Sequence, residues 1–231
     1  MNDKFTMPQK ENLFLAKRIL VDSIYKSANL EGIAVTFAET NDILNDVNIS
    51  RLKPSEITKI CCMRDAWKYL FDHIDDTLDL AFLENIHEHL ARADVEYYDL
   101  GKIRDVDVMI SGTTWRPELP DPEVLHKELQ QIMKTENATE RAINVLLWIM
   151  KSQVFKDGNK RVATLAANKI LIESGHGIFS VPVDSDGAFK TRLVKFYETD
   201  DMSDFKRWIY DNCIDGVNIS LGKPKMKGRS L

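Results

Sequence analysis

The sequence predicts a mainly α-helical protein that folds as a single domain with a short β-hairpin. Apolar residues recur at spacings of three and four along most of the 231 residues, which is the period of an amphipathic helix. One interval, between Asp94 and Pro120, alternates apolar and polar residues instead, which is the period of a strand. No internal repeat and no linker rich in Pro, Gly or Ser divides the chain, and 44% hydrophobic residues suffice for one sizeable core.

The N-terminal half is predicted to contain three helices. The first covers 11–29 and ends at Gly32; its apolar face is made of Leu13, Ala16, Leu20, Ile24 and Ala28. Pro54 opens a second helix that runs to about Ile74, because Pro is favoured in the first helical turn. Asp79 can cap a third helix over 80–91.

The hairpin and the remaining helices follow in the second half. Val106, Val108 and Ile110 alternate with polar neighbours, and residues 111–114 then form a turn. A brief strand is expected over 178–183. Helical periodicity returns over 121–134, 138–154, 159–174, 188–197 and 202–213.

Composition excludes several classes of protein. The net charge of −5 disfavours nucleic acid as a partner, because no global positive field exists. Three cysteines, an odd number without a CxxC pair, fit neither a disulfide framework nor a metal site. The N-terminus has no signal-like apolar region, and the longest apolar run, 145–150, is far shorter than the ~20 residues of a membrane span. We therefore expect a cytoplasmic protein without a membrane partner.

One segment is a candidate functional site: Gln153-Val-Phe-Lys-Asp157-Gly-Asn-Lys-Arg161, which lies between two apolar helices. A tight loop that opens a helix directs unpaired N–H groups and the positive helix end at an anion. Gly158 lets a phosphate approach the backbone, the Asn159 amide can donate, and Lys160 and Arg161 add positive charge. Asp157 beside a phosphate needs a cation, and Mg²⁺ shared with phosphate oxygens supplies one. The chemistry predicts a Mg-nucleotide site.

A simpler interpretation of the same residues stays open. Lys-Asp-Gly-Asn is also a common polar turn in a helical hairpin, with Asp157 or Asn159 as the N-cap. Short motifs alone do not decide between these two interpretations.

The segment resembles the signature loop of the Fic/Doc (Fido) family, His-x-Phe-x-Asp/Glu-Gly/Ala-Asn-Gly/Lys-Arg. Three further stretches are similar to that family in the same order. Ser27-Ala-Asn-Leu-Glu31-Gly32 resembles the inhibitory Ser/Thr-x-x-x-Glu-Gly/Asn motif of self-inhibited members. The region from Gly101-Lys-Ile-Arg104 to residue 117 resembles the flap, and 178–213 resembles the closing helices.

The resemblance implies a role for each matching residue. Asp157 would hold Mg²⁺, and the phosphates of ATP would bind at Gly158, Asn159, Lys160 and Arg161. A flap made of Val106, Val108 and Ile110 would dock a target protein by strand addition. Ser27, Glu31 and Gly32 would belong to an N-terminal inhibitory helix region at 1–40, followed by a Fic-like core at 41–216 and a disordered basic tail at 217–231.

The departures from the family pattern decide what is expected of catalysis. Gln153 stands where the family has its catalytic His, and an amide cannot take a proton from a hydroxyl. Lys160 replaces the usual Gly of adenylylating members and resembles Doc, the protein-kinase branch. Thr164 replaces a second Arg that grips the γ-phosphate and pairs with the inhibitory Glu, although Arg161 could substitute.

Several functions are therefore compatible with the sequence. The first is a nucleotide-binding Fic-family domain related to protein adenylylation, the transfer of AMP from ATP to a protein hydroxyl, with impaired or altered catalysis. The alternatives are an inactive binding or regulatory module, a Doc-like protein kinase, or, least favoured, a purely structural helical domain. ATP and an unidentified target protein are the expected partners, and a homo-oligomer is compatible with the sequence. The residues alone do not decide whether the chain is an enzyme or whether Glu31 still inhibits it.

Overall fold

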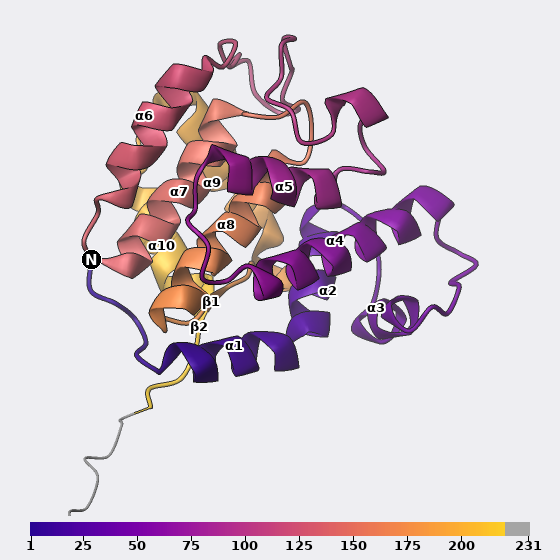
Figure 1. Cartoon of the computed structure of the whole chain (residues 1–231). Helices are drawn as coiled ribbons and strands as arrows, with labels where there is room; N and C mark the ends of the chain where they lie inside the picture. The colour runs from indigo at the N-terminus through magenta and orange to yellow at the C-terminus, as the bar shows by residue number, and fades with distance from the viewer. Residues whose placement is uncertain (220–231) are drawn as a thin grey trace, which may run out of the picture.

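The computed structural model describes residues 1–219 as a helical domain (Figure 1). Within these residues the helices are α1 (Gln9–Arg18), α2 (Leu20–Leu30), α3 (Phe37–Leu44), α4 (Pro54–Asp72), α5 (Leu80–Leu90), α6 (Pro122–Met133), α7 (Ala138–Ser152), α8 (Asn159–Ser174), α9 (Asp186–Thr199) and α10 (Ser203–Asn212). Short 3₁₀ turns lie at Tyr97–Asp99 and Val183–Ser185. The mainly α-helical fold predicted from periodicity is confirmed.

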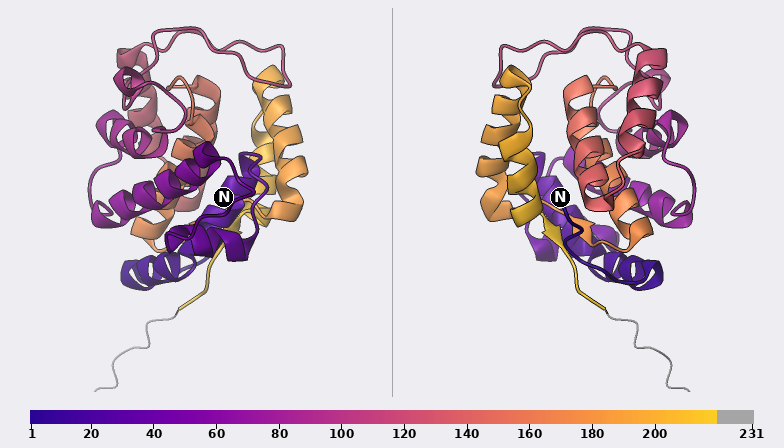
Figure 2. Two further views of the ribbon diagram at one scale, coloured as in Figure 1. Left: turned by 90° about the vertical axis from the view of Figure 1, so that its right-hand side faces the viewer. Right: turned by 90° about the vertical axis from the view of Figure 1, so that its left-hand side faces the viewer.

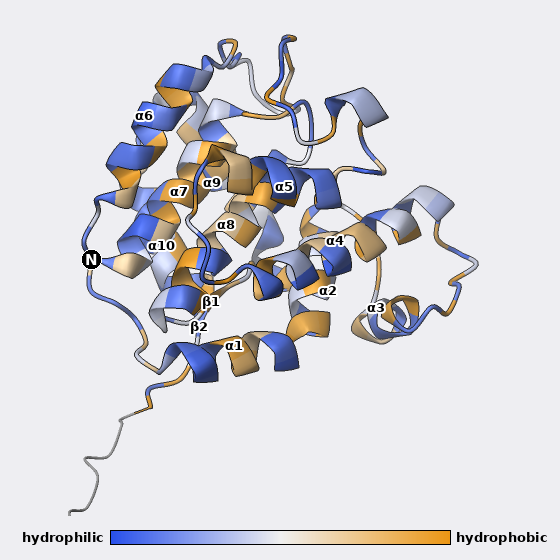
Figure 3. Cartoon of the chain, in the orientation of Figure 1, coloured by the Kyte–Doolittle hydropathy of each residue, from blue (hydrophilic) through white to orange (hydrophobic). Residues whose placement is uncertain are grey.

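α7 and α8 form the centre of the fold. They pack against each other along their lengths, and almost every residue of α8 is buried. α1, α4 and α5 contact α8, whereas α6 and α10 contact α7. Figure 3 shows the apolar colour concentrated on these central helices and the polar colour on the outward face of α6. Each fully buried Leu or Ile contributes roughly 1.5–3 kcal/mol, so the buried residues of this pair add substantially to the stability of the fold.

The helix start predicted from the cap at Asp79 is confirmed, and Asp121 caps α6 in the same way. The Asp79 carboxylate accepts a hydrogen bond from the Phe82 N–H at 2.9 Å. Asp121 accepts from the Glu123 N–H at 2.8 Å, ahead of Pro122 in the first turn of α6. Such local signals fix helix starts because the capping side chain satisfies an N–H that the helix itself leaves unpaired.

The prediction of one helix over 11–29 is wrong in one respect. The chain bends at Ile19, whose φ of −100° and ψ of 16° are not helical, and α1 and α2 are separate helices. The two have different neighbours, because α1 packs on α8 whereas α2 packs on α3 and α4. Tertiary packing therefore overrides a continuous apolar period.

α3 was not predicted, although its sequence contains a start signal. The Thr36 side chain accepts from the Glu39 N–H at 3.2 Å, and the Glu39 carboxylate accepts from the Thr36 N–H at 2.9 Å. This reciprocal pair is a capping box, and the spacing Thr-x-x-Glu is its signature.

The strands do not lie where the alternating residues predicted them. Residues 105–118, here the cavity loop, contain no strand. A strand needs a neighbour to complete its hydrogen bonds, and within residues 1–219 nothing pairs with this segment. The antiparallel sheet is instead made of β1 (Ile178–Phe179) and β2 (Ile214–Asp215), with Ile178 opposite Asp215. The strand expected over 178–183 is thus present but shorter.

Two further expectations concern the ends of the chain and the membrane. The predicted basic tail, 217–231, lies outside the described residues apart from 217–219. Among the described helices, none has both the length and the apolar character needed to cross a bilayer.

Candidate functional site

A cavity of about 810 Å³ opens between the α7–α8 loop (residues 153–158), the cavity loop and α9. Figure 2 shows the cavity loop arching across the top of the molecule towards α9. The volume is in the range of small-molecule sites. The lining consists of Glu31, residues 108–112, Gln153, residues 156–160, Lys190, Thr191, Leu193, Val194 and Tyr197.

The α7–α8 loop is a tight turn with left-handed backbone at both ends. Gln153 ends α7 with φ of 47°, and Gly158 precedes α8 with φ of 80°. A Cβ on Gly158 would lie 3.4 Å from Nη2 of Arg161 and 3.7 Å from Cδ2 of His87. Glycine thus suits position 158 in both conformation and space. Neither Asp157 nor Asn159 is the N-cap of α8, since Gly158 holds that position.

Asn159 locks the loop. Its Oδ1 accepts from the Phe155 N–H at 2.9 Å, and its Nδ2 donates to the Phe155 carbonyl at 2.7 Å and to Oε1 of Gln153 at 3.1 Å. Nε2 of Gln153 in turn donates to the Met150 carbonyl at 2.6 Å. Both amides therefore hold the loop in shape, and both hydrogens of the Asn159 amide, predicted to donate to phosphate, are already engaged.

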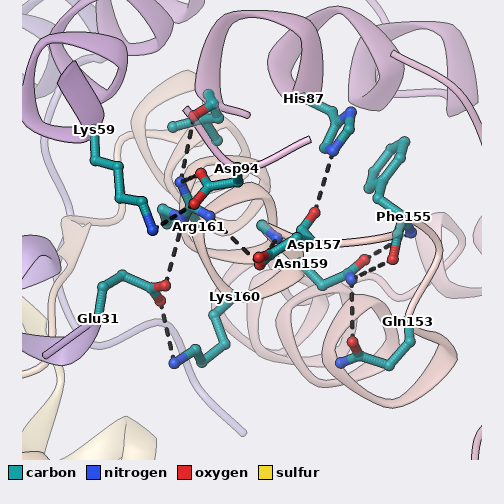
Figure 4. Close-up of polar contacts among 12 residues, drawn as sticks. Glu31, Lys59, His87, Asp94, Gln153, Phe155, Asp157, Asn159, Lys160 and Arg161 are labelled. Carbon is teal, nitrogen blue, oxygen red and sulfur yellow. Dashed lines mark hydrogen bonds and ion pairs between the residues drawn. The ribbon is translucent and has the colours of Figure 1, made fainter. Parts of the chain in front are cut away.

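His87 supports the loop from α5, and the residues around it in the sequence do not mark it as part of the site. It is fully buried and stacks on Phe155, with ring centroids 4.1 Å apart and planes 6° from parallel. Burial lowers the pKa of His87 to about 4, so the ring is neutral at pH 7. Nδ1 accepts from the Gly101 N–H at 3.0 Å, which leaves Nε2–H to donate to the Asp157 carbonyl at 3.1 Å (Figure 4). The supporting role of His87 depends on its contact with the Asp157 carbonyl, 70 residues away in the sequence.

Arg161 is buried beside the cavity and does not line it. Its Nη1 lies 2.6 Å from Oδ2 of Asp94, whose other oxygen lies 2.5 Å from Nζ of Lys59. The Arg161 and Asp94 side chains are 3% and 2% exposed, so this is a buried pair (Figure 4). Arg161 was predicted to bind phosphate, yet it is absent from the cavity lining, because Asp94 offers it a partner inside the core. Asp94 was not foreseen; nothing in its local sequence marks it.

Glu31 ends α2 and reaches the cavity. Its Oε1 lies 3.2 Å from Nζ of Lys160, and its Oε2 lies 3.5 Å from Nε of Arg161. The Glu31 N–H donates to the Ser27 carbonyl at 3.1 Å, and Gly32 follows with φ of 82°, which lets the chain leave the helix. Glu31 and Lys160 thus share one wall of the cavity, whereas Ser27 and Gly32 shape the backbone behind it.

Asp157 lies at the cavity mouth with its side chain 57% exposed. Its carboxylate accepts from the Gly158 N–H and lies 3.6 Å from Nη2 of Arg161. No cluster of three or more His, Cys, Asp or Glu side chains within residues 1–219 could hold a resident metal ion. One exposed carboxylate does fit Mg²⁺ that arrives with phosphate oxygens, since that ion commonly takes one or two protein carboxylates.

The cavity loop supplies the opposite wall. Val108 and Ile110 line the cavity, whereas Val106 is 43% exposed and does not. At its far end Trp115 stacks on Tyr197 of α9, with ring centroids 5.2 Å apart. The three residues predicted as a docking strand therefore lie in a segment without a strand partner among residues 1–219, and two of them line the cavity.

Helices packed around a central α7–α8 pair, with a tight loop between them that opens on a cavity, resemble the helical fold of Fic proteins. The Fic/DOC family model matches residues 77–171, which include α5, the cavity loop and the α7–α8 loop. No curated protein matches the chain in sequence. The family match and the solved structures described next together support a Fic domain.

Several solved structures share this fold. Fic-1 from C. elegans superposes with a TM-score of 0.69 at 20% identity, over 85% of this chain and 62% of that one. A Fic family protein from Desulfovibrio desulfuricans gives a TM-score of 0.67 at 17% identity, over 91% and 73% of the two chains. A Fic domain containing signaling protein from Bacteroides thetaiotaomicron gives 0.63 at 15%, over 80% and 73%. The chain therefore spans less than two thirds of the length of the C. elegans structure.

Proposed function

We propose that the cavity binds Mg-ATP and that the chain is a Fic-type nucleotide-transfer domain, with protein adenylylation as the default reaction and catalysis impaired at Gln153. One observation carries this proposal: the N-terminus of α8 opens into the same cavity as three lysines. The backbone N–H groups of residues 159–161 have no acceptor within their own helix, and Lys156, Lys160 and Lys190 line the cavity beside them. Such a convergence favours a polyanion.

The remaining walls favour a nucleotide over a simple anion. Leu193, Val194 and Tyr197 of α9 face the cavity together with Val108 and Ile110. A base or sugar can pack on such apolar side chains while the phosphates lie at α8. Asp157 would hold the Mg²⁺ that accompanies the phosphates and offsets their charge.

The transfer step requires a base that this chain lacks at the expected position. A target hydroxyl oxygen would bond to the α-phosphorus while the bond to the bridging oxygen breaks and pyrophosphate leaves; the hydroxyl proton needs an acceptor. Gln153 cannot accept it, and its amide is engaged with Asn159 and Met150. Loss of a general base typically costs a factor of about 10²–10⁴.

Two alternative functions have observations of their own. The structural use of the Gln153 amide favours a binding or regulatory module without chemistry. Lys160 in the cavity wall favours the Doc-like kinase branch, in which the γ-phosphoryl group is transferred. Labelling with α-³²P-ATP and with γ-³²P-ATP separates all three: label from the α position indicates adenylylation, label from γ alone indicates kinase activity, and binding without label indicates a module.

Asp157 provides the test of the metal-nucleotide site. Asp157→Ala should weaken ATP binding at least tenfold in the presence of Mg²⁺ and have little effect in EDTA, as measured by calorimetry. Asp184→Ala, in the 3₁₀ turn before α9 and outside the cavity lining, is the matched control. Equal losses with and without Mg²⁺ would show that Asp157 does not hold the ion.

A further inference from the structure

The stretch Gly101-Lys-Ile-Arg104 precedes the cavity loop, and the proposed function assigns its arginine no task. Arg104 is 4% exposed. Its Nε donates to the Gln153 carbonyl at 2.6 Å, its Nη1 donates to the Val106 carbonyl at 2.9 Å, and its Nη2 donates to the Glu118 carbonyl. One guanidinium group thus joins the start of the α7–α8 loop to both ends of the cavity loop.

The partners of Arg104 are unusual for a buried cation. Among residues 1–219 no carboxylate forms an ion pair with it, in contrast to Arg161 and Asp94. Carbonyl oxygens from three chain segments take its place. A guanidinium carries five N–H donors in one plane, so it can reach these oxygens together, whereas an ammonium group has a single donor atom.

The contact with Gln153 also bears on the backbone of the α7–α8 loop. Gln153 has φ of 47°, a conformation that is unfavourable for a residue with a side chain. The Arg104 N–H adds a bond to the Val154 carbonyl at 3.0 Å, next to the side-chain bond to Gln153. Arg104 therefore satisfies two successive carbonyls at the point where α7 ends and the loop turns.

We propose that Arg104 is a positioning residue that keeps the cavity loop closed over the α7–α8 loop and so sets the distance between the two walls of the cavity. It touches no reacting atom and does not line the cavity. Its hold on the two loops is independent of what the cavity binds; only the effect on nucleotide affinity rests on the proposed function.

The test compares Arg104→Gln and Arg104→Lys with Arg116→Gln. Arg116 lies in the same loop but is exposed, and among residues 1–219 its side chain donates only to the neighbouring Trp115 carbonyl at 3.3 Å. A protease that cleaves before Asp reports loop opening at Asp105 and Asp107, and calorimetry reports the Kd of Mg-ATP. We expect Arg104→Gln to be cleaved at least tenfold faster and to bind Mg-ATP at least tenfold more weakly. Arg104→Lys should fall between it and the wild type, and Arg116→Gln should match the wild type.

Val162→Ala separates positioning from general stability. Val162 is fully buried in α8 and does not line the cavity, so its truncation lowers the melting temperature while every hydrogen bond of Arg104 is kept. The proposal is overturned if Arg104→Gln is cleaved at the wild-type rate and binds Mg-ATP with the wild-type Kd. It is also overturned if Val162→Ala is cleaved as fast and binds as weakly as Arg104→Gln. Arg104→Lys decides by the same criteria if Arg104→Gln does not fold. Failure of the wild type to bind Mg-ATP would refute the nucleotide site alone, and the cleavage rates would still test Arg104.

Discussion

Glu31 and a bound phosphate are expected to compete for the same lysine. The Glu31 carboxylate lies 3.2 Å from Nζ of Lys160, with the two side chains 15% and 31% exposed. A partly exposed ion pair of this kind contributes about 0.5–1 kcal/mol, which a phosphate must replace. Repulsion between the carboxylate and a phosphate ~6 Å away adds about 1 kcal/mol at the high effective dielectric of a cavity mouth. Glu31→Gln removes both costs and keeps the shape of the side chain.

The sum predicts that Glu31→Gln binds Mg-ATP about ten- to thirtyfold more tightly, since ~1.4 kcal/mol corresponds to a factor of ten. Calorimetry at low salt measures the gain, and high salt should reduce it because the interaction is electrostatic. Glu173→Gln is the matched control, because Glu173 pairs with Lys169 at 2.7 Å near the other end of α8. An affinity within twofold of the wild type, or an equal gain in the control, would refute the reasoning.

Two further predictions concern the loop and its support. Gln153→His combined with Glu31→Gly should increase label transfer from α-³²P-ATP, because imidazole supplies a base near neutral pH; a variant that binds ATP but transfers no label would favour the module. His87 has its pKa lowered from 6.5 to about 4, so the unfolded chain takes up the proton first as the pH falls, and stability present above pH 6.5 is lost towards pH 4. Urea unfolding at pH 7.5 and 4.5 should show a loss of about 2.5 kcal/mol that is absent in His87→Gln, and equal losses in both proteins would contradict the assignment.

The sequence could predict the features that residues close together in the chain determine, such as helix starts and tight loops. Asp79 and Asp121 mark helix starts because a cap satisfies N–H groups only two or three residues away. The α7–α8 loop was located for the same reason, since Gly158 and the flanking apolar periods are local features. α3 could have been found from Thr36 and Glu39 by the same rule.

What the sequence could not predict depends on partners distant along the chain. The alternation at 106–110 has the period of a strand, but a strand there would need a pairing partner that residues 1–219 do not supply. Arg161 has the charge and the place in the loop that suit a phosphate ligand. Only the fold shows that Asp94, 67 positions away, holds it in the core. His87 and Arg104 are likewise defined by carbonyls of the α7–α8 loop, at separations of 70 and 49 residues.

The end of α2 fixes how fast the cavity wall can change. Ile24, Ala28 and Leu30, just before Glu31, are at most 5% exposed and belong to the main core. Undocking this helix would expose them at a cost of roughly 4 kcal/mol or more, so such a state would be populated in about one molecule in a thousand. A rotamer change of the Glu31 side chain has only to break its ion pairs with Lys160 and Arg161. The carboxylate can therefore leave and re-enter the cavity while the helix that carries it stays in place.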